Sequence, residues 1–342
     1  MPTARRRPAA QEQVLAMATG YWLSQCLYVA ARLGVADVLA KGPQTADAIA
    51  RKVGAHAPFL QRVLRALAAN GIFAADARGR FRLTPLAQTL RGNRPGSLRD
   101  FVLMIVDDYN WNAWGALAHG VTHGVRPFDH VYGLPLFDYL HQHPDKERTF
   151  AASMASISSS ENEAVARAYP FGRFTSLVDV GGAHGHLLAT ILRRHKRLRG
   201  ILYDQPQVVA GAAKSGFVTA RDVRGRCEVA GGSFFDGVPT GADGYVMKYI
   251  IHDWDDETAL RILRHCRAAM ARGGRVLVVD HVIPPGNRPN WSKHLDINMM
   301  VLPGGKERTR AEFRALLADA GLRLTKIIPT ACPLSIIESV AG

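Results

Sequence analysis

The residues after Ser176 alternate between short apolar stretches, rich in β-branched residues, and longer amphipathic stretches. Short apolar runs between glycine-rich turns are typical of buried strands, whereas apolar residues three and four apart are typical of helices. A chain in which such strands and helices follow one another builds a parallel sheet covered by helices. We therefore expect a doubly wound α/β fold, with strands at 176–181, 200–204, 227–230, 243–250 and 274–283, helices at 186–195, 256–274 and 309–320, and short final strands at 322–328 and 334–339.

A glycine-rich turn, DVGGAHG from Asp179 to Gly185, joins the first of these strands to its helix. Glycines let the backbone turn tightly, and the helix that follows directs free N–H groups at a ligand. Asp204 ends the second strand, where a carboxylate can accept hydrogen bonds from a ribose. Ala183 and His186 stand where a dinucleotide motif has glycines, which favours a ligand without pyrophosphate, such as S-adenosylmethionine. The alternative is a tight turn that binds nothing.

The segment KYIIHDWDDE follows the fourth strand, at the edge of the sheet where α/β proteins bind ligands. Asp255 or Asp256 can cap the next helix and interact favourably with its N-terminus. A hard metal ion would use the same carboxylates, but we prefer capping and expect no metal. Trp254 is explained as a core residue. His252 is the candidate for catalysis, because it follows an apolar strand directly at the ligand-binding edge.

Residues 11–91 are predicted to be mainly helical, with a helix over 14–39 that is interrupted at Gly34, shorter helices at 45–54 and 58–71, and a hairpin at 71–84. Helix, turn, helix and hairpin is the order of a winged helix. DNA binding through the helix at 58–69 is one interpretation. Its exposed Gln61, Arg62 and Arg65 are few groups with which to read a groove, so we prefer a scaffold or dimerisation module.

The region from about 97 to 175 connects these two parts and carries much of the aromatic content. Aromatic residues at helical spacing are often core, but a segment that leads into a cofactor domain is also suited to line a pocket for a flat, apolar ligand. Both interpretations stay open for Trp111, Trp114, Phe128, Tyr132, Phe137, Tyr139 and Phe150. The pair Met299 and Met300 is a further candidate for an apolar pocket.

The net charge of +14, from 43 basic and 29 acidic residues, makes a nucleic-acid partner worth considering. The basic residues are scattered, however, with runs only at Arg5–Arg7, a chain terminus, and Arg193–Arg199, which is expected to be the solvated end of a helix. The sequence contains no run of about 18 uninterrupted apolar residues and no signal-peptide pattern. The dispersed cysteines argue against a zinc site or disulfide framework. We expect a cytoplasmic protein without a nucleic-acid or membrane partner.

Several motifs together resemble the S-adenosylmethionine-dependent O-methyltransferases of the caffeate O-methyltransferase-like class, especially bacterial enzymes that methylate natural products. They occur in that family's order and spacing over nearly the whole chain, and they are DVGGAHGHLL, YDQPQVV, GGSFFDGVP, MKYIIHDWDDE, GGRVLVVDHVIP and GGKERTRAEF. The resemblance implies a Rossmann-like methyltransferase domain over 101–342, with 101–175 as its helical pocket segment. It also implies a winged-helix-like dimerisation domain over 1–100, and a homodimer.

The resemblance further implies roles for single residues. Cofactor-binding residues would be Gly181 at the methionine part, Asp204 at the ribose, Ser233 and Phe234 along the adenine, and Lys248 close to the cofactor. His252 would be the general base, flanked by Asp280 and Glu307. Three positions depart from the family pattern: Ala183 replaces a glycine, Ser233 stands where many relatives have aspartate, and Asp280 is shorter than the usual glutamate.

The sequence thus predicts methyl transfer from S-adenosylmethionine to a hydroxyl, expected to be phenolic, of an aromatic or polyketide-type small molecule. A phenol with a pKa of ~10 is about one part in a thousand ionised at pH 7, so a base at position 252 would assist attack. The alternatives are non-methylating chemistry on the same fold (decarboxylation, hydroxylation or a pericyclic reaction) and a winged-helix DNA-binding regulator. The acceptor itself cannot be read from the sequence.

Overall fold

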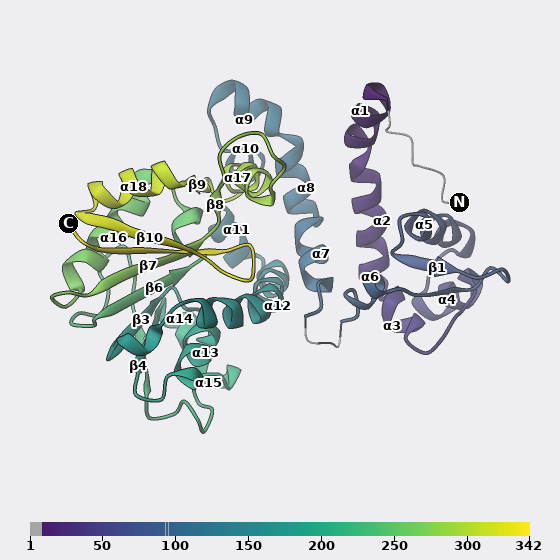
Figure 1. The fold of residues 1–342 in the computed structure, drawn as a ribbon. Coiled ribbons are helices and arrows are strands. Elements are labelled where there is room, and N and C mark those ends of the chain that lie inside the picture. Colours follow the sequence, from purple (N-terminus) through teal and green to yellow (C-terminus); the bar gives the residue numbers. More distant parts are fainter. Residues whose placement is uncertain (1–8, 93, 95) are drawn as a thin grey trace, which may run out of the picture. The chain divides into compact units, whose positions relative to one another are not determined.

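The computed structural model describes residues 9–92, 94 and 96–342, so the basic terminus with Arg5–Arg7 lies outside the described residues. The chain forms two compact units (Figure 1). The first comprises the residues up to Trp111 together with His143–Ile157, and the second comprises Asn112–Gln142 together with Ser158–Gly342. Each unit has its own hydrophobic core.

The first unit is mainly helical and contains the expected helix–turn–helix–hairpin order. Leucines of α5 pack against Phe73 and Phe81 of the hairpin in its core. Thr45 accepts a hydrogen bond from a backbone N–H at the start of α4, and the left-handed Gly34 and Gly54 follow α2 and α4, as predicted. The elements are α1 (Ala10–Ala18), α2 (Gly20–Arg32), α3 (Val35–Leu39), α4 (Ala46–Val53), α5 (Ala57–Ala69), β1 (Phe73–Ala75), β2 (Phe81–Leu83), α6 (Pro85–Gln88) and α7 (Arg99–Ile105).

The connecting region is helical, and one long helix belongs to both units. The helices are α8 (Asp108–Gly115), α9 (Leu117–His123), α10 (Pro127–Tyr132), α11 (Leu136–Gln142) and α12 (Pro144–Ala168). The first part of α12 lies in the first unit and its continuation from Ser158 lies in the second. Phe128 of α10 is fully buried and is a core residue, and its ring contacts those of the half-buried Tyr132, at 4.8 Å, and Tyr139, edge-on at 5.5 Å.

The second unit is built on a sheet with strand order β10-β11-β7-β6-β3-β4-β5, which confirms the doubly wound prediction. The strands β3 to β7 run parallel, and β10 and β11 add an antiparallel edge. The order reverses between the neighbours β3 and β6, and a doubly wound sheet binds its ligand at such a reversal. The strands are β3 (Ser176–Val180), β4 (Arg199–Asp204), β5 (Cys227–Gly231), β6 (Gly244–Lys248), β7 (Arg275–Asp280), β10 (Leu322–Pro329) and β11 (Ser335–Ala341).

Successive residues of the central strands point into two different cores, because side chains alternate across a sheet. Leu177 of β3 packs in one core with α13 (His186–Arg194) and the end of α12, whereas Val178 packs in the other with α16 (Asp256–Ala269) and α18 (Arg310–Asp319). The helices therefore cover both faces of the sheet (Figure 1). The short α14 (Pro206–Val209) and α15 (Ala212–Ser215) follow β4.

The predicted strand at 274–283 is interrupted in the structure. It ends as β7 at Asp280, and Val282–Ile283 form a separate strand, β8, that pairs in parallel with β9 (Arg308–Thr309). After β8 the chain passes through α17 (Trp291–Val301) before it returns to β9. This small pairing places the residues just before α18 beside the end of β7, which the sequence did not indicate.

The stretch Ala10–Arg32, made of α1 and α2, is long and apolar enough to cross a membrane by length and composition alone. Only 11% of its apolar part is buried in the structure. Its outer face carries exposed apolar residues, with exposed fractions of 79% for Met17 and 60% for Trp22. Such a concentration of exposed apolar side chains is typical of an interaction surface.

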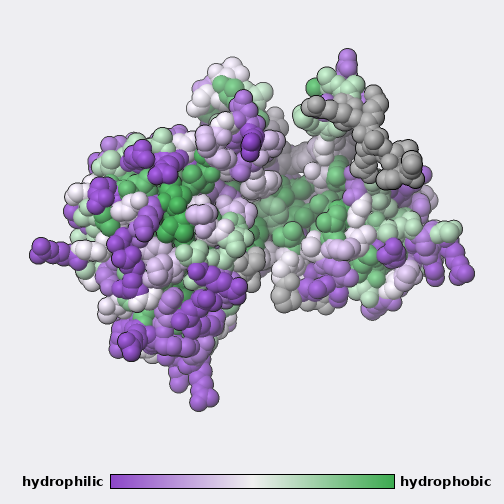
Figure 2. Space-filling model, viewed as in Figure 1, coloured by the Kyte–Doolittle hydropathy of each residue, from purple (hydrophilic) through white to green (hydrophobic). Residues whose placement is uncertain are grey.

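The basic run from Arg193 to Arg199 lies at the end of α13 and in the turn to β4, and most of its charged side chains are exposed. Hydrophilic residues cover this end of the second unit, around β4 and α15 (Figure 2). The prediction of a solvated helix end is confirmed.

Candidate functional site

The glycine turn after β3 is held by close packing that excludes larger residues. Gly181 and Gly185 have φ values of 68° and 80°, which favour glycine. A Cβ on Gly181 would lie 2.3 Å from the side chain of Ile250, and one on Gly182 would lie 2.7 Å from a carboxylate oxygen of Asp179. Ala183 also lies in the left-handed region, with φ of 49°, so the residue that departs from the family pattern adopts a conformation that glycine would take more easily.

Asp204 lies at the end of β4 beside this turn, as the sequence predicted. One carboxylate oxygen accepts a hydrogen bond of 2.8 Å from the N–H of Ala183, and the other accepts one of 2.7 Å from Gln205. Burial raises the pKa of Asp204, and these two N–H groups partly oppose that shift. The turn and the carboxylate therefore form one connected structure.

An aromatic cluster lies on the other side of the turn. Phe234 is close to Gly181, and its ring is 4.7 Å from that of Phe235 and 6.3 Å from that of Trp254. Ser233 is half-buried, and its hydroxyl accepts a hydrogen bond of 3.2 Å from the backbone N–H of Phe235. Trp254, interpreted from sequence as core, is half-buried in this cluster.

Lys248 ends β6, next to β3, and is buried against the second part of α12. Its ammonium lies 2.8 Å from the hydroxyl of Ser158 and 2.8 Å from the amide oxygen of Asn162, and it pairs with Glu161 at 3.3 Å. Burial lowers its pKa, while Glu161 and Asp179 act in the opposite direction. The position of Lys248 close to a cofactor stays a prediction, and the sequence did not indicate these partners.

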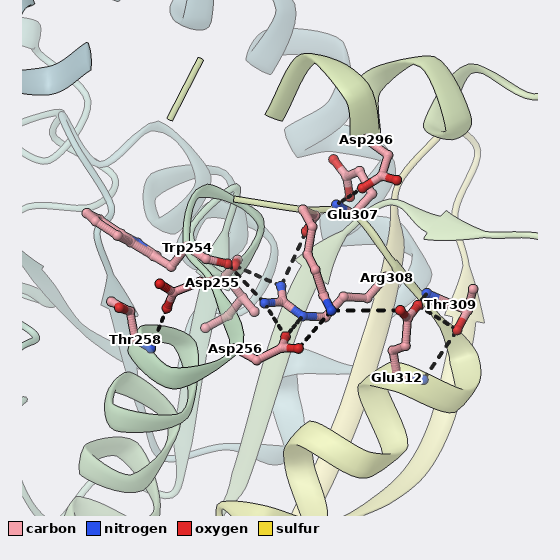
Figure 3. Close-up of polar contacts among 11 residues, drawn as sticks. Trp254, Asp255, Asp256, Thr258, Asp296, Glu307, Arg308, Thr309 and Glu312 are labelled. Atoms are coloured by element: carbon pink, nitrogen blue, oxygen red, sulfur yellow. Dashed lines mark hydrogen bonds and ion pairs between the residues drawn. The ribbon is translucent and has the colours of Figure 1, made fainter. Parts of the chain in front are cut away.

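His252 lies in a single 3₁₀ turn, Ile251–Asp253, just beyond β6, and only 7% of the residue is exposed. Its Nδ1 is hydrogen-bonded to Oε1 of Glu307 at 2.8 Å, and its Nε2 lies 3.4 Å from Oδ1 of Asp253. Glu307 is positioned in turn, because its backbone N–H donates to Asp296 of α17 at 2.9 Å (Figure 3). The sequence motifs HDW and KER, which are far apart along the chain, thus meet at one imidazole.

Arg308 holds the histidine turn in place and was not singled out from the sequence. Its guanidinium is fully buried and donates to the carbonyl oxygens of Ile251 and Trp254 at 3.0 Å each, and to the carboxylate of Asp256 at 2.9 Å (Figure 3). Those carbonyls flank His252 on both sides. The predicted helix cap is confirmed nearby, since Asp255 accepts from the N–H of Thr258 at 2.8 Å.

The buried charged groups around His252 shift one another's pKa values. Burial alone would lower the pKa of the imidazole, but the carboxylates of Asp253, Glu307 and Asp280 outweigh it and raise the pKa to about 10. Burial raises the pKa of Asp253 to about 6 and that of Asp280 to about 7, and the positive charge of His252 opposes both shifts. Strongly shifted groups at the ligand-binding edge of a sheet are typical of a catalytic site.

Asp280 is not hydrogen-bonded to His252, although it lies close enough to act on its charge. Its Oδ1 accepts the backbone N–H of Tyr249 at 3.0 Å, and its Oδ2 has no partner among the described residues. Oε2 of Glu307 and Oδ2 of Asp179 are likewise buried without a partner in the described part of the chain. No cluster of metal-ligating side chains suited to an ion occurs in the residues that the structure describes.

The aromatic connecting segment supplies both core and exposed rings. Trp114 of α8 is 37% exposed and donates to Asn298 of α17 at 3.0 Å, next to the predicted methionine pair. Phe137 of α11 is partly exposed and its ring lies 6.1 Å from that of Trp254. The core interpretation is confirmed for Phe128, and the pocket interpretation stays a prediction for Trp114 and Phe137.

Comparison with known proteins assigns both parts of the chain to one family. Residues 114–323 match the family model described as an O-methyltransferase domain, and residues 15–92 match the O-methyltransferase dimerisation domain. The chain is 42% identical to the phenazine O-methyltransferase PhzM of Lysobacter antibioticus, over 95% of each chain. It also resembles the crystal structure of LaPhzM, with a TM-score of 0.91, 40% identity, and coverage of 98% of this chain and 100% of that one.

Other relatives differ in the atom that is methylated. The structure of NcsB1, an O-methyltransferase from neocarzinostatin biosynthesis, was solved with S-adenosyl-L-homocysteine and 1,4-dihydroxy-2-naphthoic acid; it has a TM-score of 0.79 and 34% identity, and the match covers 93% of this chain and 96% of that one. A phenazine-1-carboxylate N-methyltransferase of Pseudomonas aeruginosa is 32% identical over 94% of each chain.

We predict that Arg308→Met lowers the free energy of unfolding by about 2–5 kcal/mol, because it removes the buried donor to the carbonyls of Ile251 and Trp254 and one of the two cations bonded to Asp256. Denaturant unfolding measures this. Arg310→Met, a change at an exposed arginine two residues away, is the control and should alter the free energy by less than about 0.5 kcal/mol. Equal midpoints for the two variants would contradict the role of Arg308.

A second prediction concerns the charge on His252. Glu307→Gln removes one negative charge and keeps an acceptor, so the pKa of His252 should fall from about 10 toward its ordinary value in an NMR titration. Because the folded pKa is raised, the stabilisation is fully present below pH ~6.5 and is lost as the pH rises through about 10. In Glu307→Gln this loss should occur at lower pH. Glu312→Gln should leave the titration of His252 unchanged.

Proposed function

Because the chain belongs to the S-adenosylmethionine-dependent O-methyltransferases, we propose that it methylates a phenolic hydroxyl of an aromatic natural product, with His252 as the general base. The observation that carries this proposal is the buried hydrogen bond between His252 and Glu307 at the edge of the sheet next to the glycine turn. A histidine oriented by a carboxylate is suited to accept a proton at its other nitrogen.

The glycine turn, Asp204, Ser233, Phe234 and Lys248 would hold the cofactor. S-adenosylmethionine supplies an electrophilic methyl group on a positively charged sulfur. Two features of the structure fit such a ligand: the turn excludes side chains, and the buried carboxylate of Asp179 has an unpartnered oxygen against it. Burial raises the pKa of Asp179 to about 7, and a cationic ligand would favour its ionised form.

The pKa of His252 lies near that of a phenol. The pKa of the imidazole is about 10 in this environment, and the pKa of a phenol is also ~10. Once the imidazole is deprotonated, it can accept the proton of the acceptor hydroxyl at Nε2. Glu307 holds Nδ1, so Nε2, which lies 3.4 Å from Oδ1 of Asp253, is the nitrogen that would accept the proton. Because the raised pKa leaves the imidazole of His252 protonated at neutral pH, this residue acts as a base only after it has lost that proton. The rate of methyl transfer should therefore rise with pH.

Trp114, Phe137 and the methionines of α17 favour a flat, aromatic acceptor. The naphthoic acid bound by NcsB1 has this character. An acceptor with a ring nitrogen is the second candidate, because one relative is a phenazine-1-carboxylate N-methyltransferase. A ring nitrogen without a proton needs no base, so the buried base favours a hydroxyl.

We also propose that the protein acts as a homodimer in the cytoplasm, formed through the apolar face of α1 and α2. The dimerisation domain covers this region, and its exposed apolar side chains lie on consecutive turns: Val14, Leu15, Met17, Tyr21, Trp22 and Leu23.

The proposed reaction is tested with methyl-labelled S-adenosylmethionine and a panel of phenols that includes 1,4-dihydroxy-2-naphthoic acid. A product heavier by one methyl group on oxygen is expected. His252→Gln should lower kcat by about 10²–10⁴-fold, with little change in cofactor affinity by calorimetry. His56→Gln, at an exposed histidine of the first unit, is the control. Methylation on nitrogen, or full activity of His252→Gln, would contradict the proposal.

The dimer is tested by Trp22→Glu, which places a charge on the apolar face and should weaken self-association more than about tenfold in analytical ultracentrifugation. Val121→Glu, at a residue of the second unit that is 70% exposed, is the matched control. A dimer that persists unchanged in Trp22→Glu would place the interface elsewhere.

A further inference from the structure

Tyr249 has a backbone conformation that is unfavourable for its residue type. Its φ is 59°, in the left-handed region, where a large side chain is strained. The conformation is held from β7: the backbone N–H of Tyr249 donates to Oδ1 of Asp280 at 3.0 Å and to the carbonyl of Val279 at 3.2 Å. A glycine at this position would form the same turn without strain, so the fold alone does not explain a tyrosine here.

The hydroxyl of Tyr249 is held from a different element. It donates to Oε1 of Glu161 on α12 at 2.8 Å, while Oε2 of the same carboxylate pairs with Lys248. Glu161 is only 6% exposed. Burial and the charge of Glu161 raise the pKa of the Tyr249 hydroxyl well above its usual range, so the group remains a donor. The side chain of Tyr249 is thus fixed at both ends.

Between these two attachments the ring of Tyr249 lies against His252. The ring centroids are 5.1 Å apart with an interplanar angle of 27°, a stacked arrangement. His281, whose ring lies 6.0 Å from that of Tyr249, is a further close neighbour and is buried. Glu307 is hydrogen-bonded to Nδ1 of His252 and Asp253 lies 3.4 Å from Nε2, so both carboxylates act at the edge of the imidazole. The ring of Tyr249 contacts its face and limits tilting of the imidazole out of that plane.

We infer that Tyr249 is a positioning residue for the general base: its strained turn and its bond to Glu161 hold the phenol ring as the surface against which the His252 imidazole is aligned. This inference rests on the proposed function of His252. It explains why strain is retained beside the site, and it gives the buried Glu161 of α12 a role in the reaction, although that residue need not touch substrate.

A purely structural role is the competing explanation, because Tyr249 also packs against the core beside α13. The two differ in what the ring does to His252. If Tyr249 only fills space, its loss should affect stability and leave the orientation of the imidazole intact. If it aligns the base, its loss should affect kcat and the imidazole without a matching effect on cofactor binding.

The test compares Tyr249→Gly, Tyr249→Phe and Glu161→Gln in the full chain. Tyr249→Gly removes the ring and suits the backbone; Tyr249→Phe keeps the ring and removes its bond to Glu161. Tyr245→Phe is the matched control, since Tyr245 lies on the same strand and donates its hydroxyl to the carbonyl oxygens of Pro239 and Ala269. The readouts are thermal unfolding, S-adenosylmethionine affinity by calorimetry, kcat and KM with 1,4-dihydroxy-2-naphthoic acid, and the downfield Nδ1–H resonance of His252 by NMR.

Tyr249→Gly should lower kcat about 10²-fold, as expected for a reacting group displaced by about 1 Å, with the cofactor affinity changed less than about twofold. It should also broaden or abolish the His252 resonance. Tyr249→Phe and Glu161→Gln should lower kcat less and broaden the resonance, and Tyr245→Phe should do neither. A Tyr249→Gly protein with normal kcat and a sharp His252 resonance overturns the inference. If Tyr249→Gly does not fold, Tyr249→Phe and Glu161→Gln decide: unchanged kcat and resonance in both overturn it.

A failure of the proposed function can be distinguished from a failure of this inference about Tyr249. If the wild-type chain methylates no phenol, the NMR measurement still applies: loss of the His252 resonance in Tyr249→Gly supports the alignment of the imidazole, and its retention overturns it.

Discussion

The hydrogen bond between Nδ1 of His252 and Oε1 of Glu307 is the interaction on which the arrangement of the site depends. It joins a turn after β6 to a segment just before α18, and both partners are buried. A buried carboxylate is costly unless it is paired, and the imidazole of His252 is the side-chain partner of Glu307 here. The carboxylates of Asp253, Glu307 and Asp280 together outweigh burial and raise the pKa of the imidazole to about 10, near the pKa of a phenol, ~10.

The surrounding structure keeps this pair in place by several independent attachments. Arg308 donates to the carbonyls on either side of the histidine turn, and Asp296 accepts the N–H of Glu307. Tyr249 approaches the imidazole from its face. These attachments come from α17, β9 and the end of β6, so the position of one side chain is determined by three segments. Such a supported group can act without reorganisation at the moment of reaction, which is the main advantage of a preorganised site.

Local rules were sufficient for much of the architecture. The alternation of strands and helices predicted the doubly wound sheet, and the caps at Thr45 and Asp255 were identified correctly because capping depends on residues three positions apart. The resemblance of the motifs led to His252 and Glu307, which the structure brings into contact. Asp280, expected at the flank of the histidine, lies close enough to act on its charge but bonds to the N–H of Tyr249 and not to the ring; an aspartate carboxylate reaches one methylene less far than that of a glutamate.

The sequence by itself determined the class of fold, the place of the glycine turn and the family, because these follow from periodicity and from motifs that are contiguous in the chain. Only the tertiary structure decided the roles of Glu161, Tyr249 and Arg308. Glu161 lies on a helix with no distinctive spacing around it, the left-handed φ of Tyr249 is contrary to its residue type, and Arg308 acts through carbonyls that have no side-chain signature. Contacts of this kind arise when distant segments pack, and their strength depends on burial and distance, which no local pattern contains.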